Sequence, residues 1–200
     1  MALVRSILLV DGENLVMRYQ AMLKKTGRKP KANVLHKVDT YVWTSDFGQT
    51  KIIRTDLVRI NYYTSMVGDD DAVSAVKEEL SKIIYTGIGD FYGSCQLYPR
   101  VFKKLKQSTK SRLVDINIVI DAMRHAYSDD VDVVYVFSGD GDFVNLVEDI
   151  ARSGKRVCVA AFSSGLERRL VTSVDRFVLL DDFFFESAEI AGEAVPAVTN

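Results

Sequence analysis

The sequence predicts an α/β fold in which helices cover both faces of a mainly parallel central sheet. Strand-like apolar runs alternate with helix-like segments from residue 3 to residue 180. A chain of 200 residues with 48% hydrophobic and 26% charged content has the size and composition of one globular domain. Alternating strands and helices fold most economically as a parallel sheet between two layers of helices.

The first half of the chain is predicted to contribute three strands and three helices. Residues 3–10 are apolar and β-branched and end at Asp11-Gly12, which indicates a buried strand followed by a turn. Residues 32–47 carry apolar side chains at three- and four-residue spacing and are predicted to form an amphipathic helix. Further helices are expected at 13–25 and 72–84, and further strands at 55–64 and 96–102. Pro99 weakens a central position for the last of these strands.

The second half repeats the alternation more clearly. Strands are expected at 131–137, 156–162 and 177–180, and helices at 113–127, 143–153 and 166–174. Gly154 follows the second of these helices at the position where a left-handed residue commonly ends a helix. We therefore assign residues 1–185 to one domain and residues 186–200 to a C-terminal tail, which is expected to be flexible or to form a short helix.

Charge is unevenly distributed along a chain whose net charge is −1. Residues 24–31 carry five basic residues and no acid, and residues 100–112 carry six and no acid. These runs are either solvated surface or contacts for a phosphate backbone. Tyr62, Tyr63, Tyr98 and Phe102 could stack bases beside them, although aromatic strand residues more often belong to the core.

Several classes of protein are excluded or disfavoured by missing motifs. No apolar run approaches the roughly 20 residues that cross a bilayer, so we expect a cytoplasmic protein with no membrane partner. Cys95 and Cys158 cannot make a disulfide framework and are expected to be buried thiols. The phosphate-binding glycine loops of P-loop and Rossmann proteins, the G-x-S-x-G elbow of hydrolases and zinc-ligand spacing are all missing. His36 and His125 are interpreted as ordinary histidines.

The placement of the carboxylates carries more information than their number. Asp11 follows the first predicted strand, and Asp140 and Asp142 follow the strand at 131–137. Ligands of open α/β sheets bind at the carboxyl ends of strands, where the strand order reverses. If these two strands are neighbours, the three carboxylates converge and repel one another unless a divalent cation neutralises them. Oxygen ligands without His or Cys suit Mg²⁺ or Mn²⁺.

A fourth carboxylate is expected from the helix at 113–127. Asp115 lies in its first turn, whereas Asp121 is six residues further on and points about 120° away. We favour Asp115 as the ligand and give Asp121 a supporting or salt-bridging role. Asn14 is placed to orient a water or a phosphate, or else serves only as a polar residue at a helix start.

The ordered set of these motifs resembles the NYN domain, and more narrowly the LabA-like branch of the PIN-like nuclease superfamily. The matching segments are Val10-Asp11-Gly12-Glu13-Asn14, Val114-Asp115 with Asp121, Ser138-Gly139-Asp140-Gly141-Asp142-Phe143, and Gly154-Lys155-Arg156-Val157. The resemblance implies a three-layer α/β/α fold, the strand order 3-2-1-4-5 and metal-dependent cleavage of RNA. It also implies that Asp11, Asp115, Asp140 and Asp142 hold the metal, with Asn14 and Ser138 beside them.

The sequence thus predicts a Mg²⁺- or Mn²⁺-dependent ribonuclease whose partner is RNA. The residues expected to hold the RNA backbone are Lys24, Lys25, Arg28, Lys29, Lys31, Arg100, Lys103, Lys104, Lys106, Lys110 and Arg112. Two other functions stay open: a non-catalytic RNA-binding module, and a phosphatase in which Asp11 is the nucleophile and Glu13 the second acid. A homodimer paired through an exposed helix is a further option, but no surface is selected.

Overall fold

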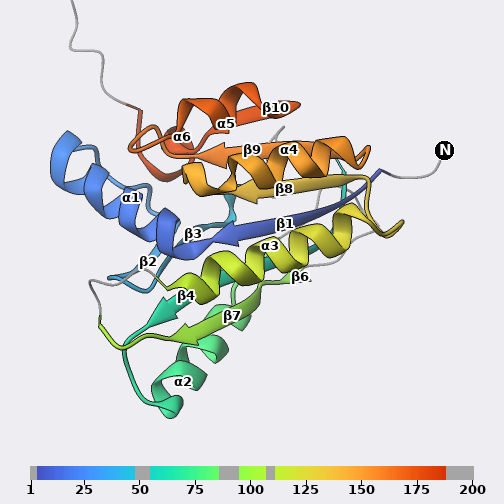
Figure 1. Cartoon of the computed structure of the whole chain (residues 1–200). Coiled ribbons are helices and arrows are strands. Elements are labelled where there is room, and N and C mark those ends of the chain that lie inside the picture. The colour runs from blue at the N-terminus through green and yellow to red at the C-terminus, as the bar shows by residue number, and fades with distance from the viewer. Residues whose placement is uncertain (1–3, 48–54, 86–94, 107–110, 188–200) are drawn as a thin grey trace, which may run out of the picture.

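Six parallel strands form the central sheet of the computed structural model, which describes residues 4–47, 55–85, 95–106 and 111–187 (Figure 1). They are β1 (Arg5–Asp11), β4 (Asp56–Met66), β7 (Tyr98–Lys103), β8 (Val133–Phe137), β9 (Arg156–Ala161) and β10 (Arg176–Leu179). Their order is β10-β9-β8-β1-β4-β7, and every neighbouring pair is parallel. Numbered along the chain, the sheet strands run 3-2-1-4-5-6, so β10, the strand predicted at 177–180, is added beside the fifth strand of the order 3-2-1-4-5.

Helices cover both faces of the sheet, which confirms the predicted three layers. The helices are α1 (Gly12–Thr26), α2 (Asp70–Ser81), α3 (Arg112–Ala126), α4 (Val144–Arg152), α5 (Arg168–Thr172) and α6 (Asp181–Phe184), with short 3₁₀ turns η1 (Ser45–Phe47) and η2 (Gly141–Phe143). Leu8 and Val10 of β1 point into a core shared with α1, α2 and α6. Ile7 and Leu9 point into a second core shared with α3, α4 and α5.

Local sequence signals explain where these helices begin and end. Asp69 accepts a hydrogen bond from the backbone N–H of Ala72 and caps α2, whose first turn carries two more acids. Gly154 has φ 88° and follows the end of α4, as expected for a left-handed residue after a helix. The helix predicted at 166–174 shortens to the five residues of α5, and the one predicted at 72–84 begins earlier and ends at Ser81.

The helix predicted at residues 32–47 is wrong, because this segment forms a β-hairpin and η1. The hairpin strands are β2 (Val34–Lys37) and β3 (Tyr41–Thr44), joined by a turn in which Asp39 has φ 54°. Half of the supposed helical stripe is exposed, with Leu35 at 47% and Val38 at 67%. Every residue of β3 is buried instead, as suits a β-branched and aromatic strand.

The hairpin is fixed to the sheet by polar contacts as well as by packing. The buried Tyr62 hydroxyl of β4 donates to the carbonyl of Val42 at 3.0 Å and accepts from its N–H at 3.1 Å. The Thr64 hydroxyl donates to the carbonyl of Thr40 at 2.6 Å. A second small ladder pairs β5 (Ile84–Tyr85) with β6 (Cys95–Gln96).

The remaining predictions about the chain are settled only in part. β7 is an edge strand, as the presence of Pro99 favours. Cys158 is a buried free thiol, and burial raises its pKa. The side chain of Cys95, residue Lys110 and residues 188–200 of the predicted tail lie outside the described residues. In the described part of the chain, no helix is both long and apolar enough to cross a membrane.

Candidate functional site

Asp11 stands at the end of β1 and is completely buried. It is the N-cap of α1: its Oδ1 accepts the backbone N–H of Asn14 at 3.0 Å. Its Oδ2 accepts a hydrogen bond from the Ser138 hydroxyl at 2.9 Å. Ser138 follows β8, which is the parallel neighbour of β1, so the predicted meeting of these two strand ends is confirmed.

One further hydrogen bond holds the loop after β8 against Asn14, and two more stabilise the loop itself. Ser138 Oγ accepts the backbone N–H of Asp140 at 3.2 Å, and Asn14 Oδ1 accepts the N–H of Gly139 at 3.2 Å. Asp140 Oδ1 in turn accepts the N–H of Asp142 at 3.0 Å and caps η2. Asp140 is half-buried and Asp142 is exposed. The Ser138 hydroxyl therefore links the Asp11 carboxylate to the backbone of Asp140.

The start of α1 approaches the start of α3 through Glu13, a residue that the sequence analysis assigned only to the phosphatase alternative. Its buried carboxylate accepts the backbone N–H of Ser111 at 3.1 Å, pairs with Lys104 Nζ at 2.9 Å and accepts a hydrogen bond from the Ser65 hydroxyl. Ser111 is the N-cap of α3, so the half-buried Asp115, in the first turn of that helix, lies at the same edge of the sheet.

Asp121 lies away from this edge, in a buried cluster of its own. Its carboxylate accepts the Tyr63 hydroxyl at 2.7 Å and pairs with Arg100 and with Arg124 at 3.1 Å each. Burial and the bond to Asp121 raise the pKa of Tyr63, so the phenol stays protonated. Asp121 thus takes the salt-bridging alternative that the sequence analysis left open.

The donor chemistry of the edge suits a hard divalent cation, but the carboxylates do not form a ready-made cage. Among residues in the described ranges, no group of three or more His, Cys, Asp or Glu side chains is arranged to hold a metal ion. Mg²⁺ keeps several of its waters and commonly binds through one or two carboxylates together with phosphate oxygens. Asp140 and Asp142 offer the one or two carboxylates that such binding needs, whereas the four aspartates Asp11, Asp115, Asp140 and Asp142 are not assembled into one ligand set.

The first basic run is partly used in internal ion pairs. Arg28 pairs with Asp182 at 2.8 Å and lies over the ring of Phe185, which ties the end of α1 to α6. Lys31 lies 3.9 Å from Asp46. Lys24, Lys25 and Lys29 are exposed. At about 1.5 Å per helical residue, Lys24 lies roughly 20 Å from Asp11.

The second basic run is divided between different surfaces. Arg100 pairs with Asp121, Lys103 pairs with the exposed Asp70 at 3.2 Å, and Lys104 is buried against Glu13. Lys106 and Arg112 are exposed. The structure therefore leaves only part of each run accessible to a ligand.

Arg18 is a cation near the edge that the sequence analysis missed. It lies one helical turn beyond Asn14 on α1, and its guanidinium is so close to Gly165 that a Cβ there would overlap it. A Cβ on Gly139 would in turn lie 3.6 Å from the Gly165 carbonyl oxygen, which places the Gly165 loop beside the Asp140 loop. Arg18 Nε is buried with no hydrogen-bond partner in the described structure. The helical spacing of four from Asn14 was the available signal.

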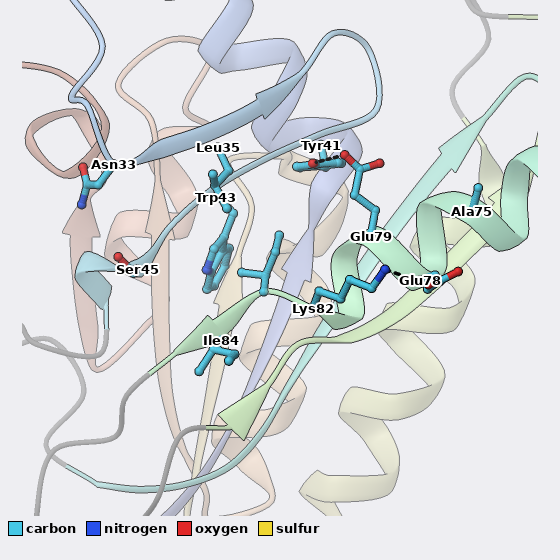
Figure 2. Close-up of a pocket in the computed structure, with 11 residues that line it drawn as sticks. Asn33, Leu35, Tyr41, Trp43, Ser45, Ala75, Glu78, Glu79, Lys82 and Ile84 are labelled. Carbon is cyan, nitrogen blue, oxygen red and sulfur yellow. Dashed lines mark hydrogen bonds and ion pairs between the residues drawn. The ribbon is translucent and has the colours of Figure 1, made fainter.

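A cavity of about 580 Å³ lies between the hairpin and α2 and includes none of the predicted site residues (Figure 2). Trp43 and Ile84 form apolar walls, and Glu79 accepts hydrogen bonds from the Tyr41 hydroxyl at 2.7 Å and from Lys37 Nζ at 2.6 Å. The hydrogen bond to Lys37 lowers the pKa of Glu79, and the bond to Tyr41 lowers it further. These contacts hold the hairpin against α2.

Comparison with known proteins gives one family and one solved structure. The model of the NYN domain matches residues 5–181. A protein of unknown function from Vibrio parahaemolyticus has a similar structure, with a TM-score of 0.60 and 23% sequence identity over 92% of this chain and 96% of that one. At that identity the likeness concerns the fold alone. No curated protein sequence matches the chain.

Proposed function

Because the chain belongs to the NYN domain family, and so to the PIN-like nuclease superfamily, we propose that it is a metal-dependent ribonuclease. The reaction is hydrolysis of an RNA phosphodiester bond at the edge formed by Asp11, Asn14, Asp115, Asp140 and Asp142. The observation that carries the proposal is the hydrogen-bonded chain from Asp11 through Ser138 to Asp140, at the ends of two adjacent parallel strands.

The metal of this proposal is Mg²⁺ or Mn²⁺, held by Asp140 and Asp142 with Asp11 and Asp115 beside them. A bound divalent cation lowers the pKa of a water molecule and stabilises charge on the phosphate. Ser138 and the N–H of Asn14 fix the direction of the Asp11 carboxylate, and the Asn14 amide fixes the backbone of Gly139. Arg18 supplies positive charge for the phosphate group.

Exposed basic residues outside the edge hold the RNA in this proposal. Lys24, Lys25 and Lys29 serve at the end of α1, and Lys106 and Arg112 near the start of α3. Arg28 and Lys104 are used in internal ion pairs and contribute to the fold instead. Binding through such lysines and arginines weakens as salt rises, because each phosphate contact releases counterions.

Two finer assignments belong to the same proposal. The motifs from Ser138 to Phe143 and from Gly154 to Val157 favour the LabA-like branch of the family. The buried free thiol of Cys158, one of only two cysteines, favours a cytoplasmic location. A homodimer has no comparable support, since no surface among the described residues is marked for it.

Cleavage of end-labelled single-stranded RNA tests the proposal directly. Products should appear in Mn²⁺ or Mg²⁺ and be missing in EDTA. We expect Asp140→Asn to lower the cleavage rate more than about 100-fold, because the loss of a residue that only supports a metal ligand already lowers activity about 10- to 100-fold. Asp71→Asn removes an exposed carboxylate from the first turn of α2 and serves as the matched control. Equal cleavage by the wild type and Asp140→Asn would reject the assignment.

The alternative is a non-catalytic RNA-binding module, favoured by the lack of a three-carboxylate cage in the described residues. It predicts that the wild type binds single-stranded RNA and yields no products in either metal. A native gel run beside the cleavage assay separates the two functions, because it shows bound and uncleaved RNA as a shifted band.

A further inference from the structure

A groove of about 380 Å³ lies beside the outer strands of the sheet, between β4, β7 and the C-terminal half of α3. We call it the edge groove. The residues that matter here are Arg59, Asn61, Tyr98, Arg100, Asp121 and Arg124. Among them, Arg100 and Asp121 belong to the predicted site and RNA-binding residues, and Tyr98 is one of the aromatic residues that the sequence offers for base stacking. The edge groove therefore needs its own explanation.

Asn61 presents an unsatisfied acceptor in the wall of the edge groove. The residue is only 5% exposed, and its Nδ2 donates to the Tyr63 hydroxyl at 3.2 Å. That hydroxyl gives its own proton to Asp121, so it can only accept from Asn61, and this fixes the orientation of the amide. Asn61 Oδ1 then has no hydrogen-bond partner in the described structure. Buried carbonyl oxygens are nearly always paired, so a ligand with an N–H donor fits this position.

Tyr98 offers a flat aromatic surface at the mouth of the edge groove. The residue is 49% exposed, and the guanidinium carbon of Arg59 lies 4.9 Å from the ring centroid. An exposed ring with an arginine beside it is the arrangement on which nucleobases stack. Exposure also means that the ring adds little to the core.

Three arginines line the edge groove together with two aspartates, of which Asp130 contacts His125 Nδ1 at 2.7 Å. Arg100 and Arg124 share the single carboxylate of Asp121, and no described carboxylate pairs with Arg59. The side chain of Arg124 is 72% exposed, which leaves guanidinium N–H donors available to an anion. The edge groove thus combines an acceptor, a stacking surface and cations within one cavity.

We propose that the edge groove binds one nucleotide of a single-stranded RNA. The base stacks on Tyr98 and donates an amino hydrogen to Asn61 Oδ1, while Arg124 and Arg59 contact the phosphate. The choice of RNA rests on the proposed function. Register supports a continuous path, because Asp11 pairs with Tyr63 and Leu9 with Asn61, which places Asn61 about 7 Å along the sheet from the Asp11 edge.

Fluorescence anisotropy with a labelled oligoadenylate tests the edge groove on the full chain in EDTA, where cleavage does not interfere. Adenine provides both a large ring surface and an exocyclic amino group. We expect Tyr98→Ala to bind at least about fivefold more weakly, the lower limit for loss of one stacked base. Arg124→Gln should reduce the slope of log affinity against log salt by about 0.7, the value for one phosphate of a single strand.

Tyr127→Ala is the matched control, because Tyr127 is also exposed, follows the last turn of α3 and contacts Asp149 of α4 instead of the edge groove. Its affinity should equal that of the wild type. The edge groove is rejected if Tyr98→Ala binds like the wild type, or if the wild type does not bind the oligonucleotide. Cleavage in Mn²⁺ is measured separately. If Tyr98→Ala binds like the wild type while the wild type cleaves RNA, the edge groove is rejected and the nuclease proposal is kept. If Tyr98→Ala weakens binding but the wild type cleaves no RNA, the edge groove is supported and the nuclease proposal is rejected.

Discussion

Asp11 and Asp121 are both buried aspartates, but their surroundings give them different tasks. Asp11 accepts hydrogen bonds from a backbone N–H and from a serine hydroxyl, which carry no charge. Asp121 accepts from a tyrosine hydroxyl and pairs with two guanidinium groups. The donors to Asp11 orient its carboxylate. The two guanidinium groups beside Asp121 orient its carboxylate and also compensate its negative charge. The comparison separates the carboxylate to which we assign part of the proposed metal site from one that is paired within the fold.

Position along the secondary structure underlies this difference. Asp11 ends a strand and begins a helix, at the edge where parallel sheets bind ligands. Asp121 lies in the middle of α3, where its side chain meets Tyr63 of β4 and Arg100 of the edge strand. Substitutions that affect one carboxylate and spare the other therefore test the comparison.

The largest expected effect on stability concerns Glu13, a neutralised carboxylate beside Asp11. Lys104 and Glu13 are each only 10% exposed, and Lys104→Met leaves the carboxylate buried without its cation. Removing one partner of a buried pair costs about 3–5 kcal/mol, so we expect a loss near 3 kcal/mol in the free energy of unfolding in urea.

Lys103→Met is the control for this prediction. Lys103 pairs with Asp70, whose side chain is 94% exposed, so its loss should cost less than about 1 kcal/mol. Equal stability of the two variants would show that Glu13 is not held by its ion pair.

A smaller loss is expected from Asp121→Asn. The amide keeps the shape of the carboxylate but removes the negative charge that pairs with two guanidinium groups. One of these, that of Arg124, is largely in water. We expect about 2 kcal/mol, below the range for fully buried pairs, measured by urea unfolding. Arg124→Gln should cost less than about 1 kcal/mol. An Asp121→Asn variant as stable as the wild type would contradict the structural role of this cluster.

The smallest effect comes from Glu79, a more exposed counterpart of Asp121 that joins Lys37 and Tyr41 to α2. Its pKa is lowered from 4.5, mainly by the bond to Lys37, so its stabilising contribution is present above about pH 4.5 and is lost as the pH falls through the lowered value. Because both partners are more than 40% exposed, we expect less than about 1 kcal/mol. Glu79→Gln should flatten the acid side of the stability profile, and an unchanged profile would assign the acid sensitivity elsewhere.

The order of strands and helices could be predicted from the sequence because local patterns encode it. The strand that ends at Asp11 and the helix that ends before Gly154 are signalled by a run of apolar residues and by a single glycine. The hairpin at 34–44 was mistaken for a helix, because Leu35, Val38 and Val42 fit a helical period. The backbone of Val42 instead bonds to Tyr62 of β4, a contact between distant residues that a local pattern does not contain.

The candidate site was predictable to a similar depth. Strand-end aspartates could be placed together, since neighbouring parallel strands end at one edge. The division of the second basic run could not be predicted. Arg100 pairs with Asp121 and Lys104 pairs with Glu13, and both partners are distant in the sequence. Side-chain pairing across the fold is invisible in a single sequence.

Binding of Mn²⁺, followed by its electron paramagnetic resonance signal, tests the contrast between the two aspartates most directly. Asp11→Asn preserves both hydrogen bonds, since the amide oxygen can accept from Asn14 and the amide nitrogen can donate to Ser138, and thermal melting confirms that each variant is folded. We predict that the wild type and Asp121→Asn bind Mn²⁺ with similar affinity, whereas Asp11→Asn binds at least about 10-fold more weakly. Equal binding by Asp11→Asn and the wild type would contradict a metal site at the Asp11 edge.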